Sequence, residues 1–210
     1  YDGIDLEQPH LKRKLLVDRL VDYCCISKFV PLIAPPGSGK TSLLALFADR
    51  VDIECIYISC DTKGHNLSRL LMPHGIDLEN QSVTGDRPRV IMLDDAQNTY
   101  LDYDSWAILV KVVSRYIPQT RFIIAATHSL KGGYDSGVEF NSFPMLRRHD
   151  LLLSDEESRQ LLTCDDHELG LAEHLQFDGL VRIISSECNG LIAALRKPYR
   201  EYIDTVLLIR

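Results

Sequence analysis

Short runs of consecutive apolar residues alternate along the chain with segments in which apolar residues recur at helical spacing. Runs without polar alternation are typical of strands that are buried on both faces of a parallel sheet, and they occupy residues 29–33, 55–59, 90–93 and 121–126. Helical spacing predicts helices over residues 11–28, 42–48, 66–72 and 106–114. This order predicts an α/β fold with three layers, in which a parallel sheet lies between helices.

The pattern changes near residue 150. Residues 73–89 and 131–144 are rich in turn-forming residues and are predicted to be loops, the second of them mobile. Residues 151–153 are predicted to form a short strand or a turn. Ser154 and Glu157 have the spacing of a capping box, and helical patterns occupy most of the chain from there to residue 203. We therefore expect a core over residues 1–150 and a helical lid or subdomain over residues 151–210.

A glycine-rich segment follows the first apolar run and opens a helix. Residues 34–41 read Ala-Pro-Pro-Gly-Ser-Gly-Lys-Thr, which is the phosphate-binding P-loop pattern with Ala34 in place of its first glycine. The Lys40 ammonium can reach the β- and γ-phosphates of a nucleotide, and the Thr41 hydroxyl can bind Mg²⁺. The following helix points the positive end of its dipole at the phosphates. The predicted nucleotide-binding residues are Pro36, Gly37, Ser38, Gly39, Lys40, Thr41 and Ser42.

Two carboxylates stand at the end of the third apolar run, where the sequence reads Val90-Ile-Met-Leu-Asp-Asp-Ala-Gln97. In parallel sheets, ligands lie beyond the carboxyl ends of the strands. Asp94 is therefore predicted to lie with Thr41 beside the metal ion. Asp95 is predicted to face the γ-phosphate and to polarise an attacking water, while Lys40 stabilises the transferred phosphoryl group.

The fourth apolar run ends in Thr127-His128-Ser129, at the same edge of the sheet as Asp94. Two interpretations of this polar end stay open. In one, Thr127 or His128 donates a hydrogen bond to the γ-phosphate or to the attacking water. In the other, both residues cap a turn and have no contact with a ligand.

Composition and charge narrow the function classes. The formal net charge is −7, which argues against a general nucleic-acid-binding surface but leaves a local basic groove open. The six cysteines contain no C-x-x-C pair, which is typical of reduced thiols in the cytoplasm or nucleus. The sequence has no apolar stretch long enough to span a bilayer, so no membrane partner is expected. The chain starts at Tyr1 and ends in apolar residues, which suggests a piece of a longer protein whose other domains are its partners.

Three segments in this order carry a resemblance: the P-loop at 34–41, the acidic strand at 91–95 and the strand with a polar end at 122–128. The chain resembles the STAND branch of AAA+-like P-loop ATPases, and in particular the ATPase module of the maltose-regulon activator family. The first two segments stand for the Walker A and Walker B motifs of that class. The resemblance implies ATP and Mg²⁺ as ligands, self-association as a homo-oligomer, and an N-terminal segment at Pro9–Leu11 that borders the adenine.

The chain departs from that family at three places, one of which is a short stretch between Asp61 and Val90. The family's Gly-x-Pro signature lacks its proline, because residues 190–192 read Gly-Leu-Ile. An arginine that senses the γ-phosphate is missing after the fourth strand, and Arg147, Arg148 and Arg196 stay open as replacements.

The leading hypothesis is an ATP hydrolase of low turnover that acts as a regulatory switch or energy module of a larger protein. Three alternatives stay open. A helicase-like motor is suggested by the similarity of Asp94-Asp-Ala-Gln97 to the helicase Asp-Glu-Ala-Gln motif. A small-molecule kinase could use the same P-loop, and a scaffold without catalysis could bind the nucleotide structurally or not bind it at all.

Overall fold

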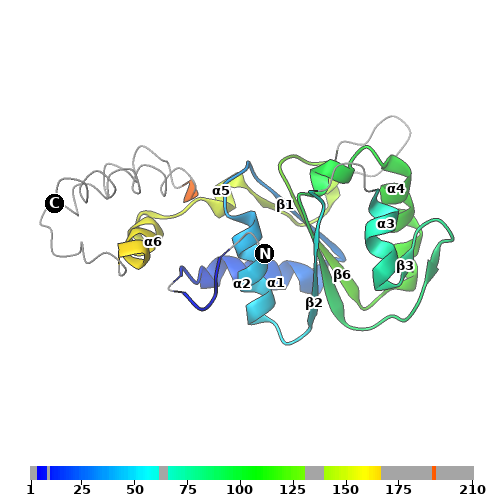
Figure 1. The fold of residues 1–210 in the computed structure, drawn as a ribbon, viewed down its shortest axis with the longest axis horizontal. Coiled ribbons are helices and arrows are strands. Elements are labelled where there is room, and N and C mark those ends of the chain that lie inside the picture. The colour runs from blue at the N-terminus through cyan, green and yellow to red at the C-terminus, as the bar shows by residue number, and fades with distance from the viewer. Residues whose placement is uncertain (1–3, 9, 62–65, 131–139, 167–190, 193–210) are drawn as a thin grey trace, which may run out of the picture.

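The computed structural model of the chain describes residues 4–8, 10–61, 66–130, 140–166 and 191–192 (Figure 1). Most of the predicted helical unit after residue 150 therefore lies outside the described residues. The division into units over 1–150 and 151–210 stays a prediction.

The core of the fold is a five-stranded parallel sheet. Its strand order is β2-β5-β6-β1-β7, with β2 at Glu54–Ser59, β5 at Arg89–Asp94, β6 at Thr120–Ala126, β1 at Phe29–Ile33 and β7 at Leu146–Arg147. All six residues of β5 are buried, as its continuous apolar run predicts. The order places the carboxyl ends of β5, β6 and β1 next to one another.

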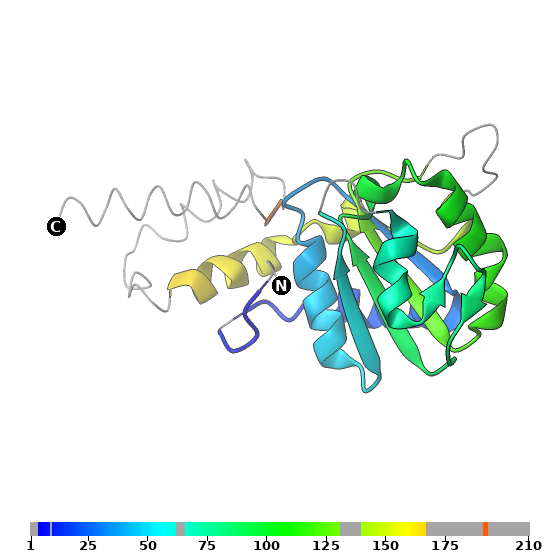
Figure 2. The same cartoon turned by 45° about the vertical axis from the view of Figure 1, so that its right-hand side comes forward.

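Helices cover both faces of this sheet. Helices α1 (Lys14–Ile26) and α2 (Lys40–Arg50) lie on one face, and α3 (Leu67–Leu71) and α4 (Tyr103–Lys111) lie on the other (Figures 1 and 2). Successive side chains of a strand point to opposite faces, so Met92 packs with the α1 and α2 residues while Ile91 packs with those of α3 and α4. The predicted three-layer α/β fold is confirmed.

Several elements differ from the sequence prediction because they are short. The predicted loop over 73–89 contains the 3₁₀ helix η1 (Met72–His74) and an antiparallel pair, β3 (Ile76–Asp77) with β4 (Ser82–Val83). Two-residue strands are too short to show alternation in the sequence. Strand β7 was not predicted for the same reason.

The predicted helix over 106–114 is displaced toward the N-terminus. Helix α4 begins earlier because the Asp102 carboxylate accepts a hydrogen bond from the Ser105 N–H at 3.4 Å and caps it. It ends at Lys111, where β-branched residues follow, and the chain continues as the 3₁₀ helix η3 (Val113–Tyr116). The remaining 3₁₀ helices of the described chain are η2 (Ala96–Thr99) and η4 (Phe140–Ser142).

The segment after β7 contains α5 (Arg148–Leu151) and α6 (Asp155–Asp166). Leu151 ends α5, so the prediction of a strand or turn over 151–153 is wrong at that residue. The predicted capping box at the start of α6 is confirmed. Glu157 N–H donates to Ser154 Oγ at 3.2 Å, and Ser154 N–H donates to Glu157 Oε2 at 3.0 Å. No helix in the described ranges is both long and apolar enough to cross a bilayer.

Candidate nucleotide site

The P-loop joins β1 to α2 and has the backbone conformation that its glycines permit. Gly37 and Gly39 have φ values of 72° and 84°, in the left-handed region that favours glycine. Ala34 does not have a positive φ, so the position of the first glycine in the pattern does not require glycine here. Ala34 is also 2% exposed, and its N–H donates to the Ala126 carbonyl at the end of β6 at 3.1 Å.

Lys40 lies inside the loop, with only 6% of its surface exposed. Its Nζ donates to the carbonyls of Ala34 at 2.9 Å and Pro35 at 3.1 Å. Burial lowers the pKa of Lys40, and the nearby charges of Asp94 and Asp95 oppose this effect. The ammonium group is thus bonded to carbonyl groups that phosphate oxygens could replace.

Asp94 ends β5 and is 3% exposed. Its Oδ2 accepts hydrogen bonds from Thr41 Oγ1 at 2.6 Å and from the Tyr57 hydroxyl at 3.0 Å. The fold therefore brings Thr41 and Asp94 together, as the sequence predicted. Tyr57 was not predicted to belong to the site. The sequence signal that could have indicated it is a phenol hydroxyl between the apolar residues of β2. Ser59 of β2 pairs with Asp94 of β5 in the strand register. Tyr57 precedes Ser59 by two residues, so the two side chains lie on the same face of the sheet.

This pair of oxygen ligands fits Mg²⁺. A hydroxyl and a carboxylate are hard donors, and Mg²⁺ in nucleotide sites commonly uses one or two protein groups and completes its shell with phosphates and water. The described residues contain no group of three or more His, Cys, Asp or Glu side chains that could hold a metal ion without such help.

Asp95 follows with an unusual backbone. Its φ is 53°, and its N–H donates to Asp94 Oδ1 at 3.0 Å. Its Oδ1 accepts a hydrogen bond from Gln97 Nε2 at 3.1 Å, and Gln97 Oε1 accepts one from the Thr127 N–H at 3.0 Å. Sequence reasoning did not assign Gln97 to the site, although it stands two residues after the second carboxylate.

Thr127 and His128 lie at the end of β6, as predicted. Thr127 Oγ1 lies 3.0 Å from His128 Nδ1. The imidazole of His128 packs edge-on against the Tyr100 ring, with 5.5 Å between the ring centroids. The role of Thr127 and His128 toward a ligand stays a prediction.

A buried thiol and a buried phenol lie near the acidic end of β5. Cys60 is 2% exposed, and its N–H donates to the Asp94 carbonyl at 2.8 Å. Burial, together with the charges of the neighbouring carboxylates, raises the pKa of the Cys60 thiol to about 12. Burial also raises the pKa of Tyr100. Both groups are therefore neutral at physiological pH and add no negative charge beside Asp94 and Asp95.

Ile192 reaches the P-loop from the C-terminal part of the chain. A Cβ atom built on Gly39 would lie 2.5 Å from Ile192 Cδ1. The segment that lacks the proline of the Gly-x-Pro signature therefore still contacts the loop, with an isoleucine at that position.

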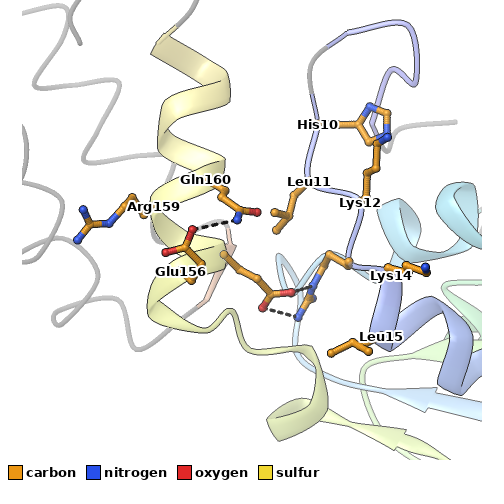
Figure 3. A pocket seen from close by; sticks show the side chains of 10 residues that line it. His10, Leu11, Lys12, Lys14, Leu15, Glu156, Arg159 and Gln160 are labelled. Atoms are coloured by element: carbon orange, nitrogen blue, oxygen red, sulfur yellow. Dashed lines mark hydrogen bonds and ion pairs between the residues drawn. The ribbon is translucent and has the colours of Figure 1, made fainter. Parts of the chain in front are cut away.

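A pocket of about 730 Å³ lies between residues 10–15 and the first turns of α6 (Figure 3). His10 and Leu11 line one side, and Glu156 and Gln160 line the other. The P-loop residues do not line this pocket.

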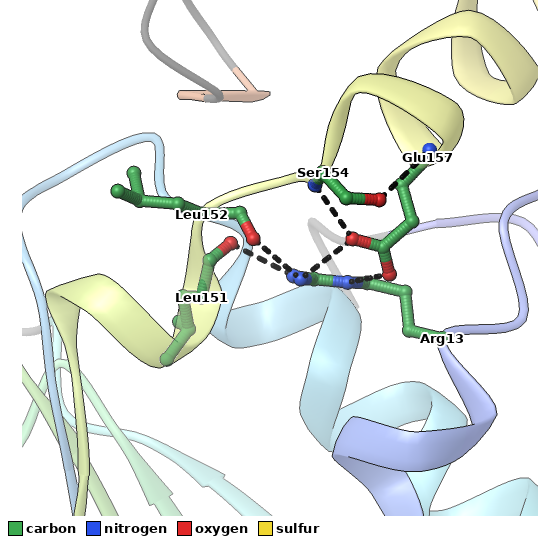
Figure 4. Close-up of polar contacts among 5 residues, drawn as sticks. All are labelled: Arg13, Leu151, Leu152, Ser154 and Glu157. Carbon is green, nitrogen blue, oxygen red and sulfur yellow. Dashed lines mark hydrogen bonds and ion pairs between the residues drawn. The ribbon is translucent and has the colours of Figure 1, made fainter.

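Arg13 joins the two sides of that pocket (Figure 4). Its guanidinium donates to the carbonyls of Leu151 at 2.9 Å and Leu152 at 3.0 Å, and to Glu157 Oε1 at 3.2 Å. The side chain is 7% exposed. Arg13, the residue directly before α1, therefore fixes the end of α5 and the start of α6 to the core.

Comparison with known proteins shows similarity of structure. No protein-family profile matches the chain, and neither does the sequence of any curated protein. A Walker-type ATPase of Pyrococcus abyssi is 12% identical with a TM-score of 0.64, over 97% of this chain and 77% of that one. The RuvB Holliday junction branch migration motor of Thermotoga maritima is 14% identical with a TM-score of 0.60, over 94% of this chain and 63% of that one. AMPPCP-bound DnaA from Aquifex aeolicus is 16% identical with a TM-score of 0.52, over 94% of this chain and 61% of that one.

The sheet order, the P-loop between β1 and α2, and these similarities define the class of the fold. The chain has the three-layer α/β fold of P-loop NTPases, which it shares with these three structures. It spans less than two thirds of the length of the RuvB and DnaA chains.

Proposed function

We propose that the chain binds ATP with Mg²⁺, hydrolyses it slowly, and serves as a regulatory switch or energy module of a larger protein. The observation that carries the proposal is the hydrogen bond of 2.6 Å between Thr41 Oγ1 and Asp94 Oδ2, beside the P-loop amine of Lys40. Two hard oxygen ligands and an ammonium group converge where a metal-bound triphosphate would lie. The STAND subclass belongs to this proposal and rests on the sequence resemblance.

Each residue has a role in this proposal. The backbone N–H groups of residues 36–42 would hold the phosphates, and Lys40 would exchange its carbonyl contacts for phosphate oxygens. Thr41 and Asp94 would hold Mg²⁺, which neutralises phosphate charge when bound. Asp95 would orient and polarise the attacking water, and Thr127 or His128 would contact the γ-phosphate or that water. Loss of the γ-phosphate would then release one arrangement of the neighbouring domains.

One feature supports the proposed position of the adenine base, and another supports the proposed cell compartment. The family resemblance implies that the N-terminal segment borders the adenine, and His10 and Leu11 do line the pocket beside α6. Cys24, Cys25, Cys55 and Cys60 are free thiols, which suits a reducing compartment such as the cytoplasm or nucleus.

Two substitutions test the proposal in the full-length parent protein. Lys40→Ala should abolish ATP binding, and Asp95→Asn should trap bound ATP and leave only a residual rate of hydrolysis. The measurements are nucleotide content after purification, the thermal shift with Mg-ATP, and phosphate release. Lys111→Ala on α4 and Asp52→Asn in the loop before β2 change the same side-chain types away from the site and should behave as the wild type. Wild-type protein that carries no nucleotide and gains no stability with Mg-ATP would instead be a scaffold.

A nucleic-acid motor is the second candidate. It is favoured by the Gln97 contact with the end of β6, in a sequence like the helicase Asp-Glu-Ala-Gln motif, and by the structural similarity to RuvB. Strong stimulation of phosphate release by single-stranded DNA or RNA would support it.

Phosphate transfer to a small acceptor would support a kinase. Light scattering with and without ATP would test self-association.

A further inference from the structure

Five hydrogen bonds connect the elements around the candidate site into a closed circuit. Thr41 donates to Asp94, and the backbone of Asp95 donates to the other oxygen of Asp94. Gln97 then bridges Asp95 and Thr127. The N–H of Ala34 donates to the carbonyl of Ala126, and the P-loop itself leads from Ala34 back to Thr41.

Gln97 closes this circuit through both ends of its amide. Its NH₂ faces the Asp95 carboxylate at 3.1 Å, and its oxygen faces the Thr127 N–H at 3.0 Å. The reverse orientation would oppose two oxygens on one side and two N–H groups on the other. The two partners therefore fix which way the amide points.

The backbone conformation of Asp95 shows why its carboxylate depends on the contact with Gln97. Asp95 precedes η2 at the N-cap position, where an aspartate side chain usually accepts a hydrogen bond from the helix backbone. Asp95 makes no such cap, and it has a φ of 53° that few non-glycine residues adopt. The carboxylate is thus held by the side chain of Gln97, which itself is bonded to the end of β6.

We propose that Gln97 is a positioning residue that sets the Asp95 carboxylate relative to the end of β6 and thereby controls the hydrolysis step. This inference rests on the proposed function, in which Asp95 orients the attacking water. Gln97 is not among the residues that we propose to bind phosphate or metal. Its loss should therefore lower the rate of the chemical step and leave ATP affinity unchanged.

The test compares Gln97→Leu and Gln97→Glu with the wild type in the full-length protein. Gln97→Leu removes both contacts at similar volume, and single-turnover hydrolysis should fall by roughly 10- to 100-fold because a small misplacement of a reacting group is costly. The Kd for Mg-ATP should stay within about twofold, since Lys40, Thr41 and Asp94 are untouched. Gln119→Leu is the control for the change of residue type, because Gln119 is exposed in the turn before β6, at the opposite end of that strand from Thr127.

Gln97→Glu keeps an acceptor for the Thr127 N–H and places a second carboxylate beside Asp95. Repulsion between the two carboxylates should move that of Asp95 out of position, so the hydrolysis rate should fall although the contact with Thr127 is kept. In ligand-free protein, hydrogen exchange of the Thr127 amide should quicken in Gln97→Leu and stay near the wild-type rate in Gln97→Glu. This readout does not depend on turnover.

A double-mutant cycle separates positioning from general structural damage. In the Asp95→Asn background, Gln97→Leu should cost less than about twofold further, because the group that it positions is already lost. Full additivity, an unchanged rate in Gln97→Leu, or an equal loss of ATP affinity would each overturn the inference while the proposed function stands. Wild-type protein without ATP binding or hydrolysis would overturn both.

Discussion

At the scale of single residues, Gly39 and Gly85 share a backbone conformation but differ in their surroundings. Their φ values are 84° and 72°, and both lie where a side chain is strained. A Cβ on Gly39 would lie 2.5 Å from Ile192 Cδ1, whereas a Cβ on Gly85 would meet no atom within 4 Å. Comparing the two positions therefore isolates the contact between the P-loop and the C-terminal segment.

We expect Gly85→Ala to lower the free energy of unfolding by about 1 kcal/mol, which is the cost of the left-handed backbone alone. Gly39→Ala should cost more than this, because Ile192 must also move, and it should weaken ATP binding. Ala34→Gly should change ATP binding little. Denaturant unfolding and thermal shifts with Mg-ATP measure these effects. Equal losses of stability at positions 39 and 85 would mean that Ile192 yields without cost.

The site residues divide into those that sequence could predict and those that it could not. Lys40, Thr41 and Asp94 were predicted because each belongs to a local pattern whose chemistry requires a particular residue type. Tyr57 and Gln97 contact their partners only through the register of β2 against β5 and through the conformation of the turn after β5. Neither is specified by nearby sequence.

At the scale of elements, the predictions succeeded where burial determines the pattern. Strands β1, β2, β5 and β6 were found within one residue of their bounds because each contains a continuous run of apolar residues. The start of α4 was missed because a cap at Asp102, rather than the first apolar residue, begins the helix. Strand β7 pairs over only two residues with β1, and no local pattern marks so short a segment.

The connection between the core and α6 depends on Arg13. We expect Arg13→Ala to lower the free energy of unfolding by about 2 kcal/mol, because it removes charge-assisted hydrogen bonds and leaves the carbonyls of Leu151 and Leu152 without this donor. Arg13→Lys should recover little, since one ammonium cannot reproduce the fork of a guanidinium.

Denaturant unfolding measures the loss at Arg13, and limited proteolysis after residue 152 reports whether α6 has been released. Lys12→Ala is the control, because Lys12 is exposed and precedes Arg13 directly. Wild-type protection of this segment in Arg13→Ala would show that the capping box and the remaining contacts hold α6 without Arg13.

At the scale of the whole molecule, the strand order determines where the chemistry can occur. The order β5-β6-β1 in the middle of the sheet brings together the acidic end of one strand, the polar end of the next and the P-loop after the third. Alternation of strands and helices predicted the layers and the shared edge. It did not predict which strands are neighbours, because that order is set by packing between distant segments.

The same strand order leaves β2 at one border of the sheet. In the described part of the chain, this strand of six residues pairs only with β5. An open strand border can recruit a strand from another molecule, and charged side chains hinder such recruitment. Glu54 places a charge at the start of β2 and bonds to Arg87 at 2.9 Å.

We therefore expect Glu54→Val to make the protein precipitate sooner at 37 °C and at a lower concentration, as followed by turbidity. Arg87→Ala removes the same ion pair but keeps the Glu54 charge, so it should remain as dispersed as the wild type. Equal precipitation of both variants would point to the lost ion pair. If only Glu54→Val precipitates, the Glu54 charge prevents fibre-like stacking of molecules through β2. This role is separate from any chemistry at the other end of the strand.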